Sequence, residues 1–305
     1  MSSPIVTIIG GSGFVGRHTV KRFCDAGWRI NVLCRDIITA EFLKTAGTVG
    51  QIVLQHVDVT KPETLEGKFT GSDVVINLVS ILYQSSRQKF ETINVKGARL
   101  IAEQAKKSGA KKFIQISALN PNPNSRYGHT KLAGEVAVRA IFPNATILRP
   151  SLIVGPEDGF FQRFGSMSMI APALPLIAGG HTRFQPVTVE NVAMAIFMAA
   201  TTDVAGKTFE LAGPKIYSMK ELLKLMLSLT GRKKYLVNIP SPIASLIGCI
   251  SEFLPFPPPI TSDQVRLLKV DNVATADALQ LKDLGIAPTV IESVLPKLLE
   301  RFNAK

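Results

Sequence analysis

The fold is decided by the stretch from Ile5 to Gly16, which reads IVTIIGGSGFVG. A short run of mostly β-branched residues leads into three glycines at a fixed spacing, Gly10, Gly13 and Gly16. This order predicts a strand, a tight turn that needs a residue without Cβ, and the start of a helix. Backbone amides at such a helix N-terminus bind a pyrophosphate. The stretch therefore predicts a dinucleotide site, and the alternative is a glycine-rich turn without a ligand.

Apolar runs alternate with helical patterns along the rest of the first two thirds of the chain. The expected strands cover residues 5–10, 29–35, 51–59, 73–80, 111–118 and 145–155, and the expected helices cover 13–26, 90–109 and 131–141. Alternation of this kind predicts a parallel sheet covered on both faces. With right-handed crossovers it becomes a doubly wound α/β sheet, the Rossmann fold.

The length and composition allow one large core or two linked cores, because 46% of the 305 residues are hydrophobic. We expect residues 1–150 to form the NAD(P)-binding domain, with residues 184–213 returning to it. The remainder of 151–305, mainly 151–183 and 214–305, is expected to form a smaller C-terminal α/β lobe.

Several classes of protein are disfavoured by simple features of the sequence. The three cysteines form no C-x-x-C pair, so we expect no disulfide framework, no metal site and a reducing compartment. We expect no signal peptide and no membrane-spanning segment, which favours a cytoplasmic location. The net charge of +12 favours an anionic partner such as a nucleotide or a membrane surface, and no nucleic acid is expected. A lysine-rich solvated surface is the alternative explanation.

The end of the second strand distinguishes between the two common dinucleotides. A carboxylate there binds the ribose of NAD, whereas an arginine accepts the 2′-phosphate of NADP. Arg35 follows the strand, Arg17 follows the last loop glycine, and Asp36 would point to the other face. These residues favour NADP(H), with NAD(H) as the alternative. Asp58 is a candidate for the adenine edge, or a turn residue at a strand end.

Stretches spread over nearly the whole chain carry a family resemblance. They include TIIGGSGFVGR, INLVSIL, NVKGARLIAEQAKKSG, YGHTK, LRPSLIVGPED, FQPVTVENVAMAI and ITSDQVRLLKVDNV. The chain resembles the extended or atypical short-chain dehydrogenases/reductases. More narrowly, it is similar to the nucleotide-binding accessory subunit of respiratory complex I (the 39 kDa type) and its alphaproteobacterial relatives. The resemblance implies a Rossmann core, a tightly held NADP(H) and complex I subunits as partners. It also implies the inner face of the inner membrane, or the mitochondrial matrix side in a eukaryote.

The residues Tyr127 and Lys131 lie four apart, so a helix would place them on one face. An ammonium group beside a phenol favours the phenolate, and a tyrosine tuned in this way can pass a proton to a carbonyl oxygen. Ser117, at the end of its strand, is the candidate that orients the carbonyl. Tyr127 and Lys131 match the catalytic and cofactor-holding tyrosine and lysine of the family, whereas an ordinary helix pair is the alternative.

The loop between Ser117 and Tyr127 is shorter than active members of the family usually carry, and Ser125 is a second candidate serine. Cofactor binding is therefore favoured over catalysis. The other residues expected to line the nucleotide are Ser12, Phe14, Val15, Val59, Asn77, Leu78, Val79, Pro150 and Ser151.

Residues 239–260 form an unusual apolar stretch that ends in the proline run Pro257 to Pro259. One interpretation is a helix buried in the small lobe. The other is a hydrophobic rim that faces lipid, quinone or a partner subunit, with the basic stretch GRKKYLV just before it.

Three functions remain open from the sequence. The first is a nucleotide-holding accessory or assembly subunit of the complex I type. The second is a free-standing NADPH-dependent oxidoreductase, either a reductase/dehydrogenase or epimerase-like, acting on an apolar carbonyl or quinone-like substrate. The third is a non-catalytic regulator that senses the cofactor. A wide pocket beside the nicotinamide would favour the enzyme, and a pocket closed by residues 118–126 would favour the subunit.

Overall fold

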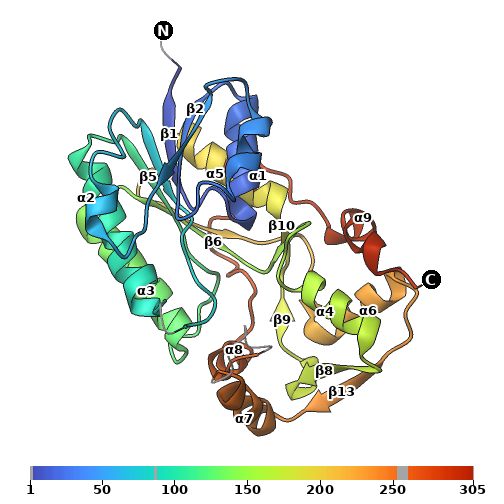
Figure 1. The fold of residues 1–305 in the computed structure, drawn as a ribbon. Helices are drawn as coiled ribbons and strands as arrows, with labels where there is room; N and C mark the ends of the chain where they lie inside the picture. The colour runs from blue at the N-terminus through green and yellow to red at the C-terminus, as the bar shows by residue number, and fades with distance from the viewer. Residues whose placement is uncertain (1–2, 86–87, 253–259, 305) are drawn as a thin grey trace.

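The centre of the molecule is a parallel β-sheet (Figure 1). Its strands are β1 (Ile5–Ile9), β2 (Arg29–Cys34), β3 (Ile52–His56), β4 (Val74–Asn77), β5 (Lys112–Ile116), β6 (Thr146–Pro150) and β11 (Thr208–Leu211). In this computed structural model, which describes residues 3–85, 88–252 and 260–304, they lie in the order β3-β2-β1-β4-β5-β6-β11. The order reverses between β1 and β4, and ligands of such sheets bind beside that reversal. The predicted doubly wound fold is confirmed.

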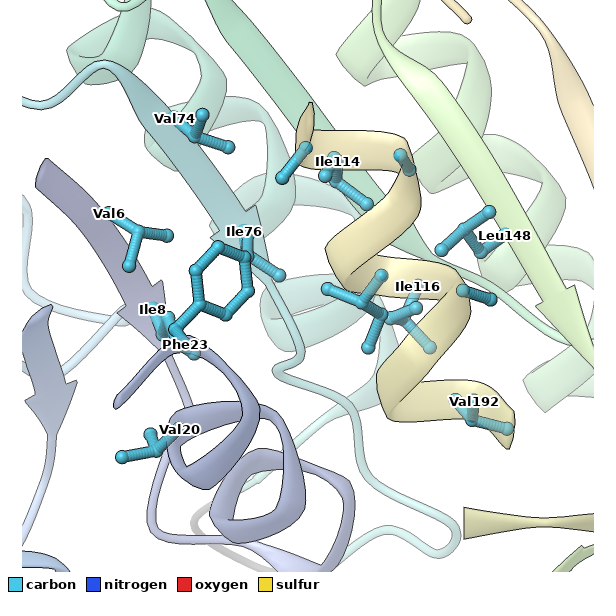
Figure 2. Close-up of a cluster of buried hydrophobic side chains, with 14 of the residues drawn as sticks. Val6, Ile8, Val20, Phe23, Val74, Ile76, Ile114, Ile116, Leu148 and Val192 are labelled. Atoms are coloured by element: carbon cyan, nitrogen blue, oxygen red, sulfur yellow. The ribbon is translucent and has the colours of Figure 1, made fainter. Parts of the chain in front are cut away.

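Helices cover both faces of the sheet. One face carries α1 (Phe14–Asp25) and α5 (Val189–Thr201), which pack against each other (Figure 2). The other face carries α2 (Ala98–Lys107) and α3 (Arg126–Ile141). The helix expected at 90–109 begins as a π-helix at Glu91–Gly97 and only then becomes α2. Single π-turns of this kind often lie at functional sites.

The two cores follow from the alternation of side chains along each strand. Ile8 of β1 points towards α1 and joins Val20 and Phe23 in one cluster, which Figure 2 shows. Its neighbour Ile9 joins the cluster beneath α2. The rings of Phe23 and Phe197 meet edge to face at 5.2 Å, which connects α1 directly to α5.

The chain leaves the sheet after β6 and comes back to it later. β11 pairs in parallel with β6, so that Leu211 lies beside Pro150 at the end of both strands. These contacts agree with the expected return of residues 184–213, whereas the domain division itself stays a prediction.

The remaining elements lie outside this sheet, and a separate hydrophobic core lies beneath α4 and α6, where the second lobe is expected. The helices among them are α4 (Phe161–Ile170), α6 (Met219–Leu229), α7 (Ser241–Ser251), α8 (Ser262–Leu267) and α9 (Leu295–Leu299), and the paired strands are β8 (Ala173–Ile177) with β13 (Tyr235–Ile239), β7 (Ile153–Val154) with β10 (Val187–Thr188), and β9 (Arg183–Phe184) with β12 (Tyr217–Ser218). Short 3-10 turns cover Glu41–Ala46, Pro62–Leu65, Ala178–Gly180, Leu281–Leu284, Ile291–Ser293 and Glu300–Phe302.

Within the apolar stretch at 239–260, residues Ser241–Ser251 form α7, and most of that helix is not buried. Its buried residues are Ala244, Gly248 and Ser251. Leu246 is 62% exposed and Ile250 is 59% exposed. The interpretation as a helix buried in the small lobe is therefore wrong for this face. The proline run at Pro257 to Pro259 lies outside the described residues.

Within residues 3–85, 88–252 and 260–304, none of the helices combines the length and the apolar character that crossing a bilayer requires.

Candidate functional site

The glycine loop has the shape that a pyrophosphate requires. Gly10 adopts a φ of +81°, which favours glycine, and a Cβ there would lie 3.3 Å from Cγ2 of Val79. A Cβ at Gly16 would overlap the carbonyl oxygens of Gly10 and Gly11, so helix and turn pack without a side chain between them. The N-cap of α1 is Gly13, which has no side chain to cap the helix. A phosphate group can therefore approach the first amides of α1.

The other candidate residues in this loop are Ser12, Phe14 and Val15. Ser12 and Val15 are partly buried, and Phe14 meets the ring of His18 edge to face at 6.1 Å. The ring of Phe14 also lies against Gly155, where a Cβ would lie 2.8 Å from the ring. The loop is thus held between the sheet and the chain that follows β7.

Arg17 and Arg35 are the two residues expected to contact the 2′-phosphate of NADP. Arg17 donates a 2.9 Å hydrogen bond to Glu157 and lies 4.7 Å over the ring of Phe42. Its Nε is buried and has no hydrogen-bond partner within the described residues. Arg35 is exposed directly after β2. The residues present fit a dinucleotide, because Arg17 has a buried Nε without a partner among the described residues and Arg35 is an exposed cation at the end of β2.

The carboxylates near these arginines are used within the chain. Asp36 accepts a 3.1 Å hydrogen bond from the amide of Thr39, as a turn residue does. Asp58 accepts 2.9 Å and 2.7 Å bonds from Thr60. Burial opposes ionisation of Asp58, but these bonds and the charge of Arg35 hold its pKa below the ordinary value. The turn interpretation of Asp58 is supported, and its contact with adenine stays a prediction.

At the end of β4, the side chain of Asn77 organises the backbone. Its Nδ2 donates to Oε1 of Gln115 at 2.9 Å, and its Oδ1 accepts from the amide of Val79 at 3.0 Å. Leu78 and Val79 then run past Gly10. Val59, three residues after the end of β3, is buried against Gly97 of the π-helix.

Tyr127 and Lys131 are brought together with a serine that the sequence analysis missed. The hydroxyl group of Tyr127 shares a hydrogen bond with Ser80, and Nζ of Lys131 lies 3.5 Å from the same serine oxygen. Nζ also donates a 2.9 Å bond to the carbonyl oxygen of Ile116. Ser80 follows Asn77 by three residues at the same sheet edge, and that position is the signal that could have identified it.

The pKa of Tyr127 is shifted in the direction opposite to the expectation. Burial raises the pKa of Tyr127 to about 12, against a weaker effect of Ser80. Burial lowers the pKa of Lys131 to about 8, although the charge of Glu135 opposes this. The predicted lowering of the tyrosine pKa is therefore wrong, because desolvation of the phenol is the largest contribution.

A network of polar side chains holds Ser80 in place. Oγ of Ser80 donates to Oδ1 of Asn94 at 3.3 Å, and Nδ2 of Asn94 donates to Oγ1 of Thr130 at 3.1 Å. The backbone of Asn94 lies so close to Gly134 that a Cβ there would overlap its carbonyl oxygen. The π-helix and α3 are thus in close contact, which places Ser80 beside the Tyr127 hydroxyl.

The two serines predicted from the sequence have different surroundings. Ser117 is 5% exposed, and its Oγ has no hydrogen-bond partner in the described part of the chain. It can therefore serve a ligand group, and its role stays a prediction. Ser125 is the N-cap of α3, since its Oγ accepts from the amide of Gly128 at 2.9 Å. The alternative of Ser125 as the catalytic serine does not fit this capping role.

The remaining candidates close the site on the side of the second lobe. Pro150 ends β6 and is buried, and its carbonyl oxygen accepts from the amide of Leu119 at 3.0 Å. The hydroxyl group of Ser151 donates to Oδ1 of Asn272 at 2.7 Å. The site residues of the sheet are therefore attached to the last part of the chain.

A hollow of about 330 Å³ opens beside the first turn of α3. Residues 123–126 form part of its wall, and neither Tyr127 nor Lys131 lines it. Among the residues that the structure describes, no group of three or more His, Cys, Asp or Glu side chains is arranged to hold a metal ion.

The family model described as "NAD dependent epimerase/dehydratase family" matches residues 6–212. The chain belongs to this family. Its glycine loop, its Tyr127–Lys131 pair and β11 all lie within the matched region, whereas most of the second lobe lies beyond it.

Named relatives of this family member include subunits and enzymes. It is 32% identical, over 99% of its own chain and 81% of the relative, to the rat mitochondrial "NADH dehydrogenase [ubiquinone] 1 alpha subcomplex subunit 9". It is 31% identical to "Ceramide reductase" of Caulobacter vibrioides, over 78% of this chain and 74% of that one. A solved dTDP-glucose 4,6-dehydratase (DesIV) from Streptomyces venezuelae, with NAD and TYD bound, has the same fold, with a TM-score of 0.76 at 16% identity over 98% of this chain and 96% of the other.

Proposed function

We propose that this protein holds NADP(H) at the glycine loop and serves as an accessory or assembly subunit of a complex I-type respiratory enzyme. The observation that carries the proposal is the 32% identity with the rat complex I subunit over 99% of this chain. This coverage includes the second lobe, most of which lies outside the region that the family model matches.

The preference for NADP(H) over NAD(H) rests on charge. Arg35 is exposed at the end of β2, and Arg17 has a buried Nε without a partner in the described residues. Arginine binds phosphate through charge-assisted hydrogen bonds, which are stronger than neutral ones. The carboxylate of Asp36 accepts a hydrogen bond from the amide of Thr39. Because this carboxylate is used within the chain, we propose that the arginines, and not Asp36, contact the phosphorylated ribose.

The site residues support holding the nucleotide more than turning it over. When bound, the nicotinamide supplies or accepts a hydride. Tyr127, with a pKa of about 12, stays protonated at neutral pH and keeps its hydroxyl proton for an acceptor. Lys131, with a pKa of about 8, carries a proton at neutral pH and donates to the carbonyl oxygen of Ile116 at the end of β5. We infer that both side chains serve as hydrogen-bond donors at the nucleotide site.

Purification from membranes of the native host tests the proposal. We expect NADP(H) to be released when the purified protein is denatured, and we expect subunits of a respiratory NADH dehydrogenase to co-elute. A protein that elutes alone and without nucleotide would contradict the proposal.

A free-standing reductase is the second candidate, and the contact between Tyr127 and Ser80 favours it. A hydroxyl pair at the nucleotide site can polarise a carbonyl oxygen and supply its proton. The similarity to a protein named ceramide reductase points to a lipid-like substrate. NADPH oxidation in the presence of apolar aldehydes, ketones and quinones would reveal this activity.

We also propose that α7 lies against an anionic membrane surface, which places the protein at the inner face of the respiratory membrane. Leu246 and Ile250 expose most of their side chains on this helix. Lys233 and Lys234 precede β13, the strand that leads directly into α7. Apolar side chains beside cations are the combination that binds anionic headgroups.

A further inference from the structure

The first turn of α3 is capped from two different parts of the chain. The first amides of a helix lack partners within the helix and need acceptors from elsewhere. Oγ of Ser125 accepts from the amide of Gly128 at 2.9 Å. The amides of Arg126 and Tyr127 donate instead to Oδ1 and Oδ2 of Asp263, at 2.7 Å and 2.9 Å. One carboxylate from the second lobe therefore serves two consecutive amides of the helix that carries the nucleotide-site pair.

Asp263 is available for this contact because its own helix has a separate cap. It lies in the first turn of α8, where Thr261 accepts the amide of Gln264 and the Gln264 side chain accepts the amide of Thr261. Asp263 is 8% exposed, and the guanidinium group of Arg266 lies 4.0 Å from it. A buried carboxylate with two short bonds to amides holds its partners in a defined geometry.

The segment around Asp263 also holds the loop that leads into α3. Nδ2 of Asn122 donates to the carbonyl oxygen of Arg266 at 2.9 Å. Nδ2 of Asn272 donates to the carbonyl oxygen of Leu119 at 2.7 Å. The short loop at 118–126 is thus attached to the second lobe at Leu119 and at Asn122.

We propose that Asp263 is a positioning residue of the nucleotide site, because its carboxylate fixes the first turn of α3 and thereby the placement of Tyr127 and Lys131. This inference rests on the proposed nucleotide binding. Asp263 lies outside residues 6–212, the region that the family model matches. A carboxylate at a helix N-terminus is also favoured by the helix dipole, so its loss loosens the turn next to it.

The substitution that tests the proposal is Asp263→Asn, which keeps the shape but places an NH₂ group against an amide donor. Glu221→Gln is the control, since Oε2 of Glu221 accepts the amide of Ser218 at 2.6 Å at the start of α6. Both variants lose a carboxylate that accepts an amide at the start of a helix. We expect Asp263→Asn to raise the Kd for NADPH about three- to tenfold, the size of a carboxylate–helix interaction. We expect Glu221→Gln to change it by less than about twofold, within the range of a distant site.

Combining each variant with Lys131→Ala separates positioning from a general loss of stability. If Asp263 acts through α3, Lys131→Ala should weaken NADPH binding less in the Asp263→Asn background than in the wild type. In the Glu221→Gln background its effect should be unchanged. An additive cycle for Asp263, or an Asp263→Asn variant that binds like the Glu221→Gln control, overturns the inference.

Hydrogen exchange of the wild-type protein gives a second measurement that does not depend on how a variant folds. NADPH should slow amide exchange in residues 261–268 together with residues 122–131, because the two segments are joined through Asp263. Slower exchange at 122–131 alone overturns the inference and leaves nucleotide binding intact. A wild-type protein that binds neither NADPH nor NADH overturns both this inference and the proposed function.

Discussion

Nζ of Lys131 donates a hydrogen bond of 2.9 Å to the carbonyl oxygen of Ile116, the last residue of β5. The lysine is 4% exposed, so its ammonium group has exchanged water for one carbonyl oxygen and the nearby Ser80. Burial of this kind disfavours the charged form of an amine. Lys131 thus sits close to losing its proton in the nucleotide-free protein.

The stability of the protein should therefore depend on pH through Lys131. Burial lowers its pKa from 10.5 to about 8, so between these values the unfolded chain binds the proton and the folded chain does not. Stability relative to Lys131→Met should rise as the pH goes from about 8 to about 10.5, by up to about 3 kcal/mol in total. Denaturant unfolding of both proteins across this range measures the difference. Lys107→Met, at an exposed position of α2, is the control. Parallel curves for wild type and Lys131→Met would contradict the lowered pKa.

Arg35 should set the choice between the two nucleotides. Arg35→Ala is expected to remove about 1.5–3 kcal/mol of the preference for NADPH over NADH, the range for a hydrogen bond to a charged group. Titration of both nucleotides against both proteins measures this. Arg29→Ala, at the opposite end of β2, is the control and should leave the preference unchanged. Equal affinities of the wild type for NADPH and NADH would rule out the assignment.

Tyr127 and Lys131 should respond differently if the protein holds its nucleotide without turning it over. Tyr127→Phe is then expected to be silent, whereas Lys131→Ala should lower NADPH affinity and the stabilisation that NADPH provides, about 2.7 kcal/mol at a hundredfold excess over Kd. Thermal melting with and without NADPH gives this readout. A carbonyl- or quinone-dependent oxidation of NADPH that falls about 10²–10⁴-fold in Tyr127→Phe would instead establish the reductase.

The exposed face of α7 should bind anionic liposomes. Replacing Leu246 and Ile250 with Glu is expected to abolish co-sedimentation while thermal stability is retained, because both side chains are mostly exposed. High salt should weaken the binding of the wild type. The control replaces Ile38 and Val49 with Glu. Both side chains are fully or mostly exposed, at 84% and 107%, and lie far from α7 in the sequence, so this variant should bind liposomes as the wild type does. Failure of the Leu246/Ile250 variant to fold would show that this face is part of a core.

The sheet and the glycine loop could be predicted because they depend on local patterns. Gly10, Gly13 and Gly16 follow a strand at a fixed spacing, and the structure places Gly10 in the turn, Gly13 at the N-cap of α1 and Gly16 in its first turn. Tyr127 and Lys131 could be paired because a helix relates residues four apart.

The parts that could not be predicted depend on burial or on distant residues. Asp263 meets Arg126 across 137 positions, and no local pattern encodes that contact. Ser80 lies near Tyr127 only because two strand ends share one edge of the sheet. The direction of the Tyr127 pKa was wrong because a sequence shows a neighbouring lysine but not the loss of water around the phenol.

The late return of β11 and α5 to the sheet has a consequence during synthesis. On the ribosome, β6 is complete at Pro150, but the strand that pairs with it ends only at Leu211. Roughly 60 residues separate the two, which take several seconds to add at about 5–20 residues per second. During that interval the nascent sheet presents an unpaired edge, and the apolar surface that α5 will cover beside Phe23 is open. Unpaired edges next to apolar surface are prone to associate with other chains, so we expect the half-made protein to need protection from aggregation until α5 and β11 emerge.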